Sequence, residues 1–183
     1  MRVTVAAEPA VPQWTGKPEM PVIPAEHSAE WIALCDALAR TTTATAVFET
    51  VDAARRQLIG AGLLTISRFD AERSRLTRIW SSNLAAYPVG GSKDKADTPW
   101  TRQVLQRGEV FIGEGAVALA AAFDDHPRIA SLGLNSIINV PLLSRGHCVG
   151  TFNLLSICSA WTQRQIAIVR LLALAALPAV LTS

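Results

Sequence analysis

The sequence predicts an α+β domain built on an antiparallel sheet. Its strand patterns come in two pairs, each pair joined by a short turn, and helical patterns stand before the first pair and after the second. Half of the 183 residues are hydrophobic and 17% are charged, which is enough apolar surface for one sizeable core. These observations together indicate a single domain with an appendage.

The appendage is the N-terminal segment, residues 1–26, and the domain is expected to occupy residues 27–183. Prolines at positions 9, 12, 18, 21 and 24 remove backbone donors and block helix formation, so an extended arm is expected. Trp14 within this arm is a candidate for docking on a neighbouring surface.

Two amphipathic helices are expected to open the domain. Ser28 suits the N-cap of the first helix, and Gly60 ends the second. Their apolar residues recur at helical spacing: Trp31, Leu34, Cys35 and Leu38 in the first, and Val47, Val51, Ala54 and Leu58 in the second.

Two strand pairs form the predicted sheet. The first pair covers residues 63–70 and 75–81, and the second covers 135–143 and 148–156. A final helix over 162–177 is apolar on almost every side, which is typical of a helix that a partner subunit also covers.

Shorter elements are expected between the two strand pairs. Thr98 can cap a helix that has Pro99 at its first position. A short strand over 110–112 follows, and 115–123 and 127–133 are expected to form short helices or turns.

Charge and hydropathy argue against two kinds of partner. The chain has 17 basic and 15 acidic residues and no basic run, so no nucleic-acid partner is expected. The most apolar run, 166–181, is interrupted by Arg170 and Pro178 and is short for a membrane span, so no membrane partner is expected.

The cysteines indicate a reducing compartment. An odd count of three, Cys35, Cys148 and Cys158, without the apolar stretch of a signal peptide favours reduced, mostly buried thiols in a cytoplasmic protein. No cysteine or histidine spacing indicates a metal site.

The stretch SIINVPLLSRGHCVGTFNLLS, residues 136–156, resembles the most recognisable hairpin of the GAF domain family. In that family a small residue starts a strand ending in Val-Pro-Leu, a tight turn follows, and Gly-x-x-x-Leu opens the next strand. The matching residues here are Ser136, Val140, Pro141, Leu142, Gly150 and Leu154. The resemblance covers roughly residues 30–180, and YPVGG…TPW and FDDHPRIASLG look like a subgroup of small stand-alone bacterial GAF proteins.

The resemblance implies a fold and a class of function. It implies an antiparallel sheet of about six strands, with terminal helices on one face, where homodimers often form, and a covered ligand pocket on the other. Family ligands include cyclic nucleotides, bilins, haem, small anions and amino-acid derivatives. A stand-alone sensor of this kind would signal through its dimer or a separate partner, although fold alone does not settle function.

The parity of the second strand pair brings two amides together. Because side chains alternate along a strand, two sets each share one face: Ile137, Asn139, Pro141 and Leu143, and Val149, Thr151, Asn153 and Leu155. The resemblance places these sets on the pocket-facing side. If Asn139 and Asn153 lie opposite or diagonal, their amides either contact a ligand or satisfy each other and nearby backbone.

The stretch YPVGGSKDKADTPW, residues 87–100, is a candidate pocket rim. It lacks the spacing of a phosphate-binding P-loop, but Gly90 and Gly91 permit close approach of the backbone. Lys93 and Lys95 either attract an anionic ligand or belong to a solvated turn.

Three further residues of this stretch are candidates for ligand contact. The helix start at Thr98 offers free N–H groups to a carboxylate or phosphate. Tyr87 and Trp100 either wall an apolar or planar ligand or, in the case of Trp100, face the core.

His126 stands where acidic residues adjoin a histidine. Asp124 or Asp125 could orient it as an acid–base pair, although the sequence supplies no matching nucleophile, and His126 could equally be a turn residue. The loops over 84–134 contain no cysteine, so neither bilin attachment nor the cysteine chemistry of free methionine sulfoxide reductase, a GAF enzyme, is expected; no haem attachment site is evident either.

The leading hypothesis is a cytoplasmic, homodimeric sensory domain that binds a small anionic or amide-bearing metabolite. The residues expected to contact it are Tyr87, Gly91, Thr98, Trp100, His126, Asn139 and Asn153. One alternative is an enzyme that uses the same pocket with His126 and Asp125 as its acid–base pair. The other is a dimeric interaction module in which the pocket has collapsed.

Overall fold

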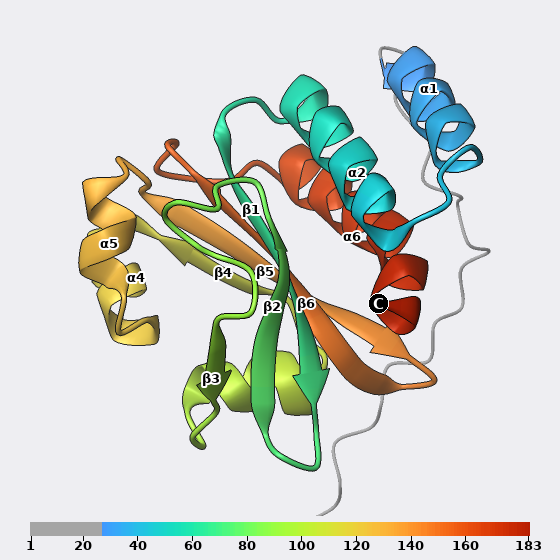
Figure 1. Ribbon diagram of the computed structural model, residues 1–183. Coiled ribbons are helices and arrows are strands. Elements are labelled where there is room, and N and C mark those ends of the chain that lie inside the picture. The colour runs from blue at the N-terminus through green and yellow to red at the C-terminus, as the bar shows by residue number, and fades with distance from the viewer. Residues whose placement is uncertain (1–26) are drawn as a thin grey trace, which may run out of the picture.

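The structure, a computed structural model, describes residues 27–183, so the arm expected at 1–26 and its Trp14 lie outside the described residues. Six antiparallel strands form one curled sheet in the order β3-β2-β1-β6-β5-β4 (Figure 1). The strands are β1 (Gly62–Asp70), β2 (Arg75–Ser81), β3 (Ser92–Asp94), β4 (Phe111–Glu114), β5 (Ser136–Ser144) and β6 (His147–Ser156). The predicted α+β fold is confirmed.

Three helices cover one face of the sheet, here called the helix face. They are α1 (Ser28–Leu38), α2 (Ala44–Leu58) and α6 (Gln163–Thr182). Helices α2 and α6 lie side by side across the strands, and α1 packs outside them (Figure 1). The main core lies between these helices and the sheet, and its fully buried side chains include Val51, Leu64, Ile66, Ile138, Phe152, Val169 and Leu172.

Short elements cover the opposite face, here called the cavity face. They are α3 (Pro99–Thr101), a π-helical turn η2 (Arg102–Gln106), α4 (Gly115–Ala122) and α5 (His126–Ser131). Thr98 caps α3, as predicted, by accepting a hydrogen bond from the Thr101 N–H at 3.1 Å. Two smaller apolar clusters hold these elements on the sheet, one around Leu119, Ile129 and Leu155 and the other around Leu76, Trp100 and Leu105.

Two elements differ from the sequence prediction. Residues 92–94 lie in a stretch expected to be loop, yet they pair with the edge of β2 as the short strand β3. Helix α6 continues past Pro178 to Thr182, because Ala179 and Val180 are buried against the core and this burial offsets the hydrogen bond that proline cannot donate.

Helix α6 is long and apolar enough to cross a membrane by length and composition alone. In the structure it packs against α2 and the sheet instead, through residues that include Val169, Leu172 and Ala176. Leu171 and Leu174 remain exposed on its outer side. The homodimer expected through the terminal helices stays a prediction.

The prediction that the cysteines are core thiols is wrong for Cys35 and Cys158, which are exposed. Helix α1 buries only Leu34, so its neighbour Cys35 turns away from the core, and Cys158 lies in the bend after β6. Cys148 is half-buried, and burial raises the pKa of its thiol.

Candidate functional site

A cavity of about 650 Å³ lies on the cavity face, between the central strands and their cover, within the range of roughly 300–1,000 Å³ typical of small-molecule sites. The polar side chains around it are Thr65, Ser67, Arg78, Tyr87, Ser92, Lys93, Lys95, Asp125, Arg128, Asn139, Thr151 and Asn153. Apolar side chains complete the wall, among them Leu76, Trp100, Phe123, Ile129, Ile137 and Leu155. The pocket is therefore open rather than collapsed.

The floor of the cavity is an amide pair on neighbouring strands. Asn139 on β5 lies directly opposite Asn153 on β6, and its Nδ2 donates to Asn153 Oδ1 at 2.7 Å. Asn153 Nδ2 in turn donates to Thr151 Oγ1 at 3.1 Å and Thr65 Oγ1 at 3.3 Å. The predicted parity is correct at both positions, and the amides satisfy each other, which was one of the two interpretations left open.

The amide pair also holds Trp100 in place. Trp100 Nε1 donates to Asn139 Oδ1 at 2.9 Å, and both side chains are buried. Because Asn139 thereby uses its carbonyl for Trp100 and its amino group for Asn153, it links β6, β5 and α3 through one side chain. The indole both faces the core and lines the cavity, so the two interpretations of Trp100 are compatible.

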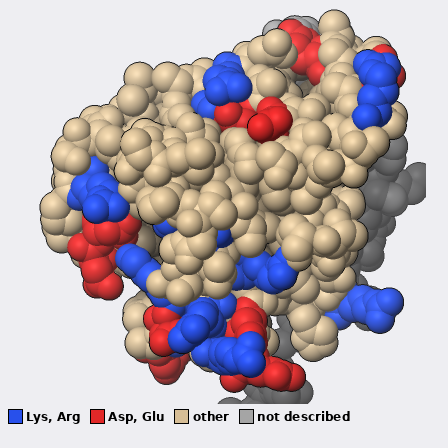
Figure 2. Space-filling model, in the orientation of Figure 1, with Lys and Arg blue, Asp and Glu red and all other residues tan. Residues whose placement is uncertain are grey.

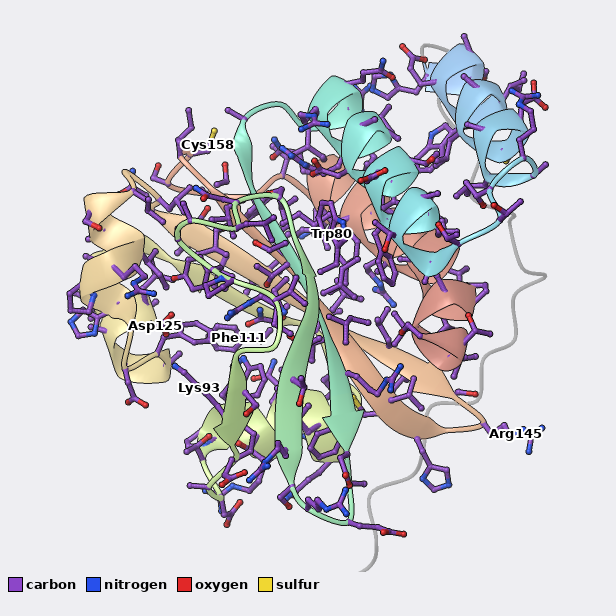
Figure 3. The ribbon with its side chains drawn as sticks, viewed as in Figure 1. Trp80, Lys93, Phe111, Asp125, Arg145 and Cys158 are labelled. Atoms are coloured by element: carbon purple, nitrogen blue, oxygen red, sulfur yellow. The ribbon has the colours of Figure 1, made fainter. Side chains whose placement is uncertain are left out.

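A β-bulge directs Arg78 into the cavity. Ser67 on β1 pairs with Arg78, whereas Ile66 pairs with Trp80, so β2 carries Ile79 as an extra residue between them. The extra residue reverses the alternation of side chains. Trp80 therefore lies on the helix face (Figure 3), where it packs near Phe48. Arg78 lines the cavity.

A second bulge corrects the predicted parity at the start of β6. Leu142 pairs with Gly150 and Leu143 with Cys148, which leaves Val149 as the extra residue. Val149 packs with the helix-face core, and Cys148 packs with the cluster around Trp100, the reverse of what strict alternation predicts.

The guanidinium of Arg78 is held by the loop above it. Its Nη1 donates to the Pro88 carbonyl at 3.0 Å, and its Cζ lies 4.9 Å from the centre of the Tyr87 ring. The Gly91 backbone approaches so closely that a Cβ there would stand 2.8 Å from Arg78 Nη1. Burial lowers the pKa of Arg78, and the guanidinium nevertheless stays charged at neutral pH.

Asp125 joins three parts of the cavity wall. One of its oxygens accepts from the Tyr87 hydroxyl at 3.0 Å, and the other lies 3.3 Å from Lys93 Nζ. Figure 3 shows the Lys93 side chain on β3 and Asp125, at the start of α5, near each other. Burial alone would raise the pKa of Asp125, but the charge of Lys93 and these two hydrogen bonds outweigh it and keep the pKa low. Burial and the nearby carboxylate raise the pKa of Tyr87, so its phenol stays protonated.

Lys95 lies over the indole of Trp100, with Nζ 4.5 Å from the ring centre. Its side chain is half-buried, and burial, with repulsion from Lys93, lowers the pKa of its ammonium. The solvated-turn interpretation is therefore wrong for Lys95, which the aromatic ring draws inward. Lys93 is exposed but also lines the cavity.

Five of the seven residues expected to contact a ligand surround this one cavity: Tyr87, Gly91, Trp100, Asn139 and Asn153. The other two, Thr98 and His126, lie outside its lining. The hydroxyl of Thr98 is used as a helix cap, and His126 Nδ1 lies 3.0 Å from the Phe123 carbonyl.

The structure does not bring His126 and Asp125 together as a pair. Asp125 is bonded to Tyr87 and Lys93, and His126 turns toward the backbone at Phe123. Across residues 27–183, His, Cys, Asp and Glu side chains form no group of three or more that could hold a metal ion.

Sequence reasoning missed Arg78 and Arg128. Arg78 and Trp80 have the same parity along the strand, and only the bulge at Ile79 puts them on opposite faces. Arg128 on α5 donates to the Ala86 carbonyl at 3.0 Å and lies 6.0 Å from the Tyr87 ring centre. The run of arginines at 73, 75 and 78 along the first hairpin is no signal for a basic wall, because Arg73 and Arg75 pair with Asp70 and Asp94 outside the cavity lining.

The antiparallel sheet with helices on one face and a covered cavity on the other defines a class of small domains with room for a small molecule. The GAF domain family model matches residues 36–178, and the chain therefore belongs to the GAF domain family. GAF domains are typically sensory, small-molecule-binding domains. No curated protein sequence matches the chain.

Solved structures agree with this assignment. The GAF domain of a phosphoenolpyruvate-protein phosphotransferase from Coxiella burnetii has a TM-score of 0.69 at 12% identity, covering 84% of this chain and 92% of its own. The GAF domain of the phosphoenolpyruvate-protein phosphotransferase from Acinetobacter has a TM-score of 0.66 at 16% identity, and the match covers 86% of this chain and 94% of that domain. The chromophore-binding domain of a bacteriophytochrome from R. palustris has a TM-score of 0.63 at 10% identity, and the match covers 83% of this chain and 60% of that one. At these identities the likeness establishes the fold.

The amide network should make Asn139 important for stability. Asn139→Ala leaves the buried Trp100 Nε1 and the Asn153 carbonyl unpaired, and each unpaired buried group costs about 1–3 kcal/mol. Chemical denaturation should therefore show a loss of more than about 2 kcal/mol in the free energy of unfolding.

Asn135→Ala is the matched control. Asn135 is exposed and its side chain makes one hydrogen bond, to the Ile157 carbonyl, so a loss of about 1 kcal/mol or less is expected. Equal losses in the two variants would show that the network on the cavity floor is not a significant source of stability.

Proposed function

We propose that this protein is a sensory GAF domain that binds a small anionic metabolite in the cavity between the sheet and its cover. The observation that carries the proposal is the charge of the wall. Four cationic side chains, Arg78, Lys93, Lys95 and Arg128, line the cavity together with a single carboxylate, Asp125.

This imbalance favours anions. Charges of one sign in a concave site with low-dielectric walls reinforce one another and raise the local concentration of the opposite charge. The surface over β3 and the β1–β2 hairpin mixes basic and acidic side chains (Figure 2), whereas the cavity lining has four cationic side chains and one carboxylate. Hydroxyl groups of Thr65, Ser67, Ser92 and Thr151 add neutral hydrogen-bonding groups.

The amide-bearing ligand is the weaker of the two expected classes. Asn139 and Asn153 would recognise an amide best, but their donors and acceptors are already bonded to each other, to Trp100 and to threonine hydroxyls. Of the four cationic side chains of the wall, only Lys93 is paired with a carboxylate among residues 27–183, so an anion is the better match for this cavity.

Ligand binding would also change the contacts that join β3 and the loop after β2 to α5. Lys93 and Tyr87 both bond to Asp125, so β3, the loop after β2 and the start of α5 meet at one carboxylate. An incoming anion would compete with Asp125 for Lys93. Such an exchange would loosen β3 from α5, and we propose this as the change that a partner protein or second copy detects.

Calorimetric titration tests the proposal directly. Small carboxylate and phosphate anions should bind, and their uncharged amides should not. Arg128→Glu should weaken anion binding by at least about threefold at low ionic strength, and the effect should shrink with added salt because this rim cation is exposed.

Arg107→Glu is the matched control, since Arg107 is an exposed arginine outside the cavity lining and pairs with Glu109. It should leave anion affinity unchanged. Titrations in which no anion binds, or in which the uncharged amides bind as tightly, would contradict the proposal.

Asp125→Asn should increase affinity for anions. The substitution removes the one carboxylate of the wall and frees Lys93, and a unit charge several ångströms away is worth about 1 kcal/mol in a partly solvated site. We expect roughly a 3- to 10-fold gain, measured in the same titrations. Weaker anion binding in a variant that is folded by circular dichroism would show that Asp125 helps to bind the ligand.

A further inference from the structure

The four cations of the cavity are not equally supplied with counter-charges. Lys93 has Asp125, and the exposed Arg128 donates to a backbone carbonyl at the rim. Arg78 and Lys95 are half-buried, and among residues 27–183 neither lies within 4.0 Å of a carboxylate oxygen. Within this part of the chain, two partly buried positive charges therefore lack an ion-pair partner.

Arg78 is fixed in position, and only part of its guanidinium is used in hydrogen bonds. Its backbone N–H donates to Gly91 at 2.8 Å and its carbonyl accepts from Gly90 at 2.9 Å, which fixes the residue against the loop. Nη1 donates to the Pro88 carbonyl, and the guanidinium carbon lies 4.9 Å from the centre of the Tyr87 ring. Nε is buried and has no hydrogen-bond partner among the residues that the structure describes. A guanidinium with free donors in a fork is suited to a carboxylate or phosphate.

Lys95 is likewise held against an aromatic side chain, that of Trp100. Its ammonium lies over the Trp100 ring, and that ring is fixed by its bond to Asn139. The ring steadies the cation without neutralising it, because the indole carries no net charge. Each of the two cations thus rests on its own aromatic side chain, and each aromatic side chain is itself hydrogen-bonded.

We infer that the ligand carries two separate anionic groups on a short, largely apolar skeleton, one group for Arg78 and one for Lys95. This inference rests on the proposed function and specifies its ligand class: a dicarboxylate, or an acid that carries both a carboxylate and a phosphate. Two charges on one skeleton would supply both missing counter-ions at once.

The remaining wall agrees with this class. Leu76, Phe123, Ile129, Ile137 and Leu155 offer apolar surface to the skeleton, and the cavity of about 650 Å³ has room for a molecule of this size. Asp125 does not take the place of the second anion, because its two oxygens are already bonded to Tyr87 and Lys93. Its charge nevertheless favours the cationic form of both Arg78 and Lys95.

The test compares ligands of equal shape and different charge. Malonate, succinate, glutarate and adipate are titrated calorimetrically at neutral pH beside their monoamides and diamides, with glycerol 3-phosphate and 3-phosphoglycerate as the phosphate arm. For the best-fitting skeleton we expect the dianion to bind at least tenfold more tightly than its monoamide, and the diamide not to bind. Tighter binding of 3-phosphoglycerate than of any dicarboxylate would assign one of the two groups as phosphate.

Variants assign the two charges to the two cations. Arg78→Met and Lys95→Met should each reduce the preference for dianion over monoamide to less than threefold. Arg75→Met is the matched control, since Arg75 lies on the same strand but pairs with the exposed Asp94 outside the cavity lining. It should retain the full preference. Thermal unfolding and near-ultraviolet circular dichroism confirm that each variant is folded.

The outcomes separate this inference from the proposed function. If the monoamide binds as tightly as the dianion, or if the preference survives in both Arg78→Met and Lys95→Met, the two-anion inference is wrong while anion binding stands. If no anion of either arm binds to the wild-type protein, the proposed function itself is wrong.

Discussion

The hydrogen bond between Asn139 and Asn153 is the interaction on which the candidate site depends. It requires β5 and β6 to pair in one register, because a shift of β5 by one residue would turn Asn139 to the helix face and away from Asn153. The same amide of Asn139 fixes Trp100, and Trp100 supports Lys95. A single buried network therefore connects the sheet register to the position of a charge in the cavity.

Two aromatic residues of the cavity, Tyr87 and Trp100, hold cations rather than standing free for a ligand. Tyr87 lies beneath Arg78 and Trp100 beneath Lys95, at 4.9 and 4.5 Å from the ring centres. Partly buried charges without counter-ions cost stability, and such costs are typical of sites that are shaped for binding rather than for folding. The aromatic supports lower this cost and leave the charges available to a ligand.

Much of the fold could be predicted from the sequence because the patterns were local. The strand pairs, the cap at Thr98 and the facing amides follow from alternation and turn chemistry. The three-residue strand β3 could not be found this way, because it is formed by pairing with the edge of β2 and has no pattern of its own. The extension of α6 beyond Pro178 likewise depends on tertiary burial.

The candidate site was less predictable than the fold for a related reason. Two β-bulges, at Ile79 and Val149, reverse the alternation where it decides which side chains face the cavity. Alternation places Val149 on the cavity face, which is wrong, and it cannot separate Arg78 from Trp80, which have the same parity but lie on opposite faces. The charge of the wall also comes from side chains distant in sequence, β2 for Arg78 and α5 for Arg128, which only the folded chain brings together.

A crystal structure of the protein grown in a high concentration of the best-binding dicarboxylate is the most direct test of this account. One carboxylate is expected within hydrogen-bond distance of the Arg78 guanidinium and the other within reach of Lys95 Nζ, with Asn139 and Asn153 still bonded to each other. An empty cavity in which Arg78 and Lys95 point to solvent, or a cavity filled by protein side chains, would contradict it.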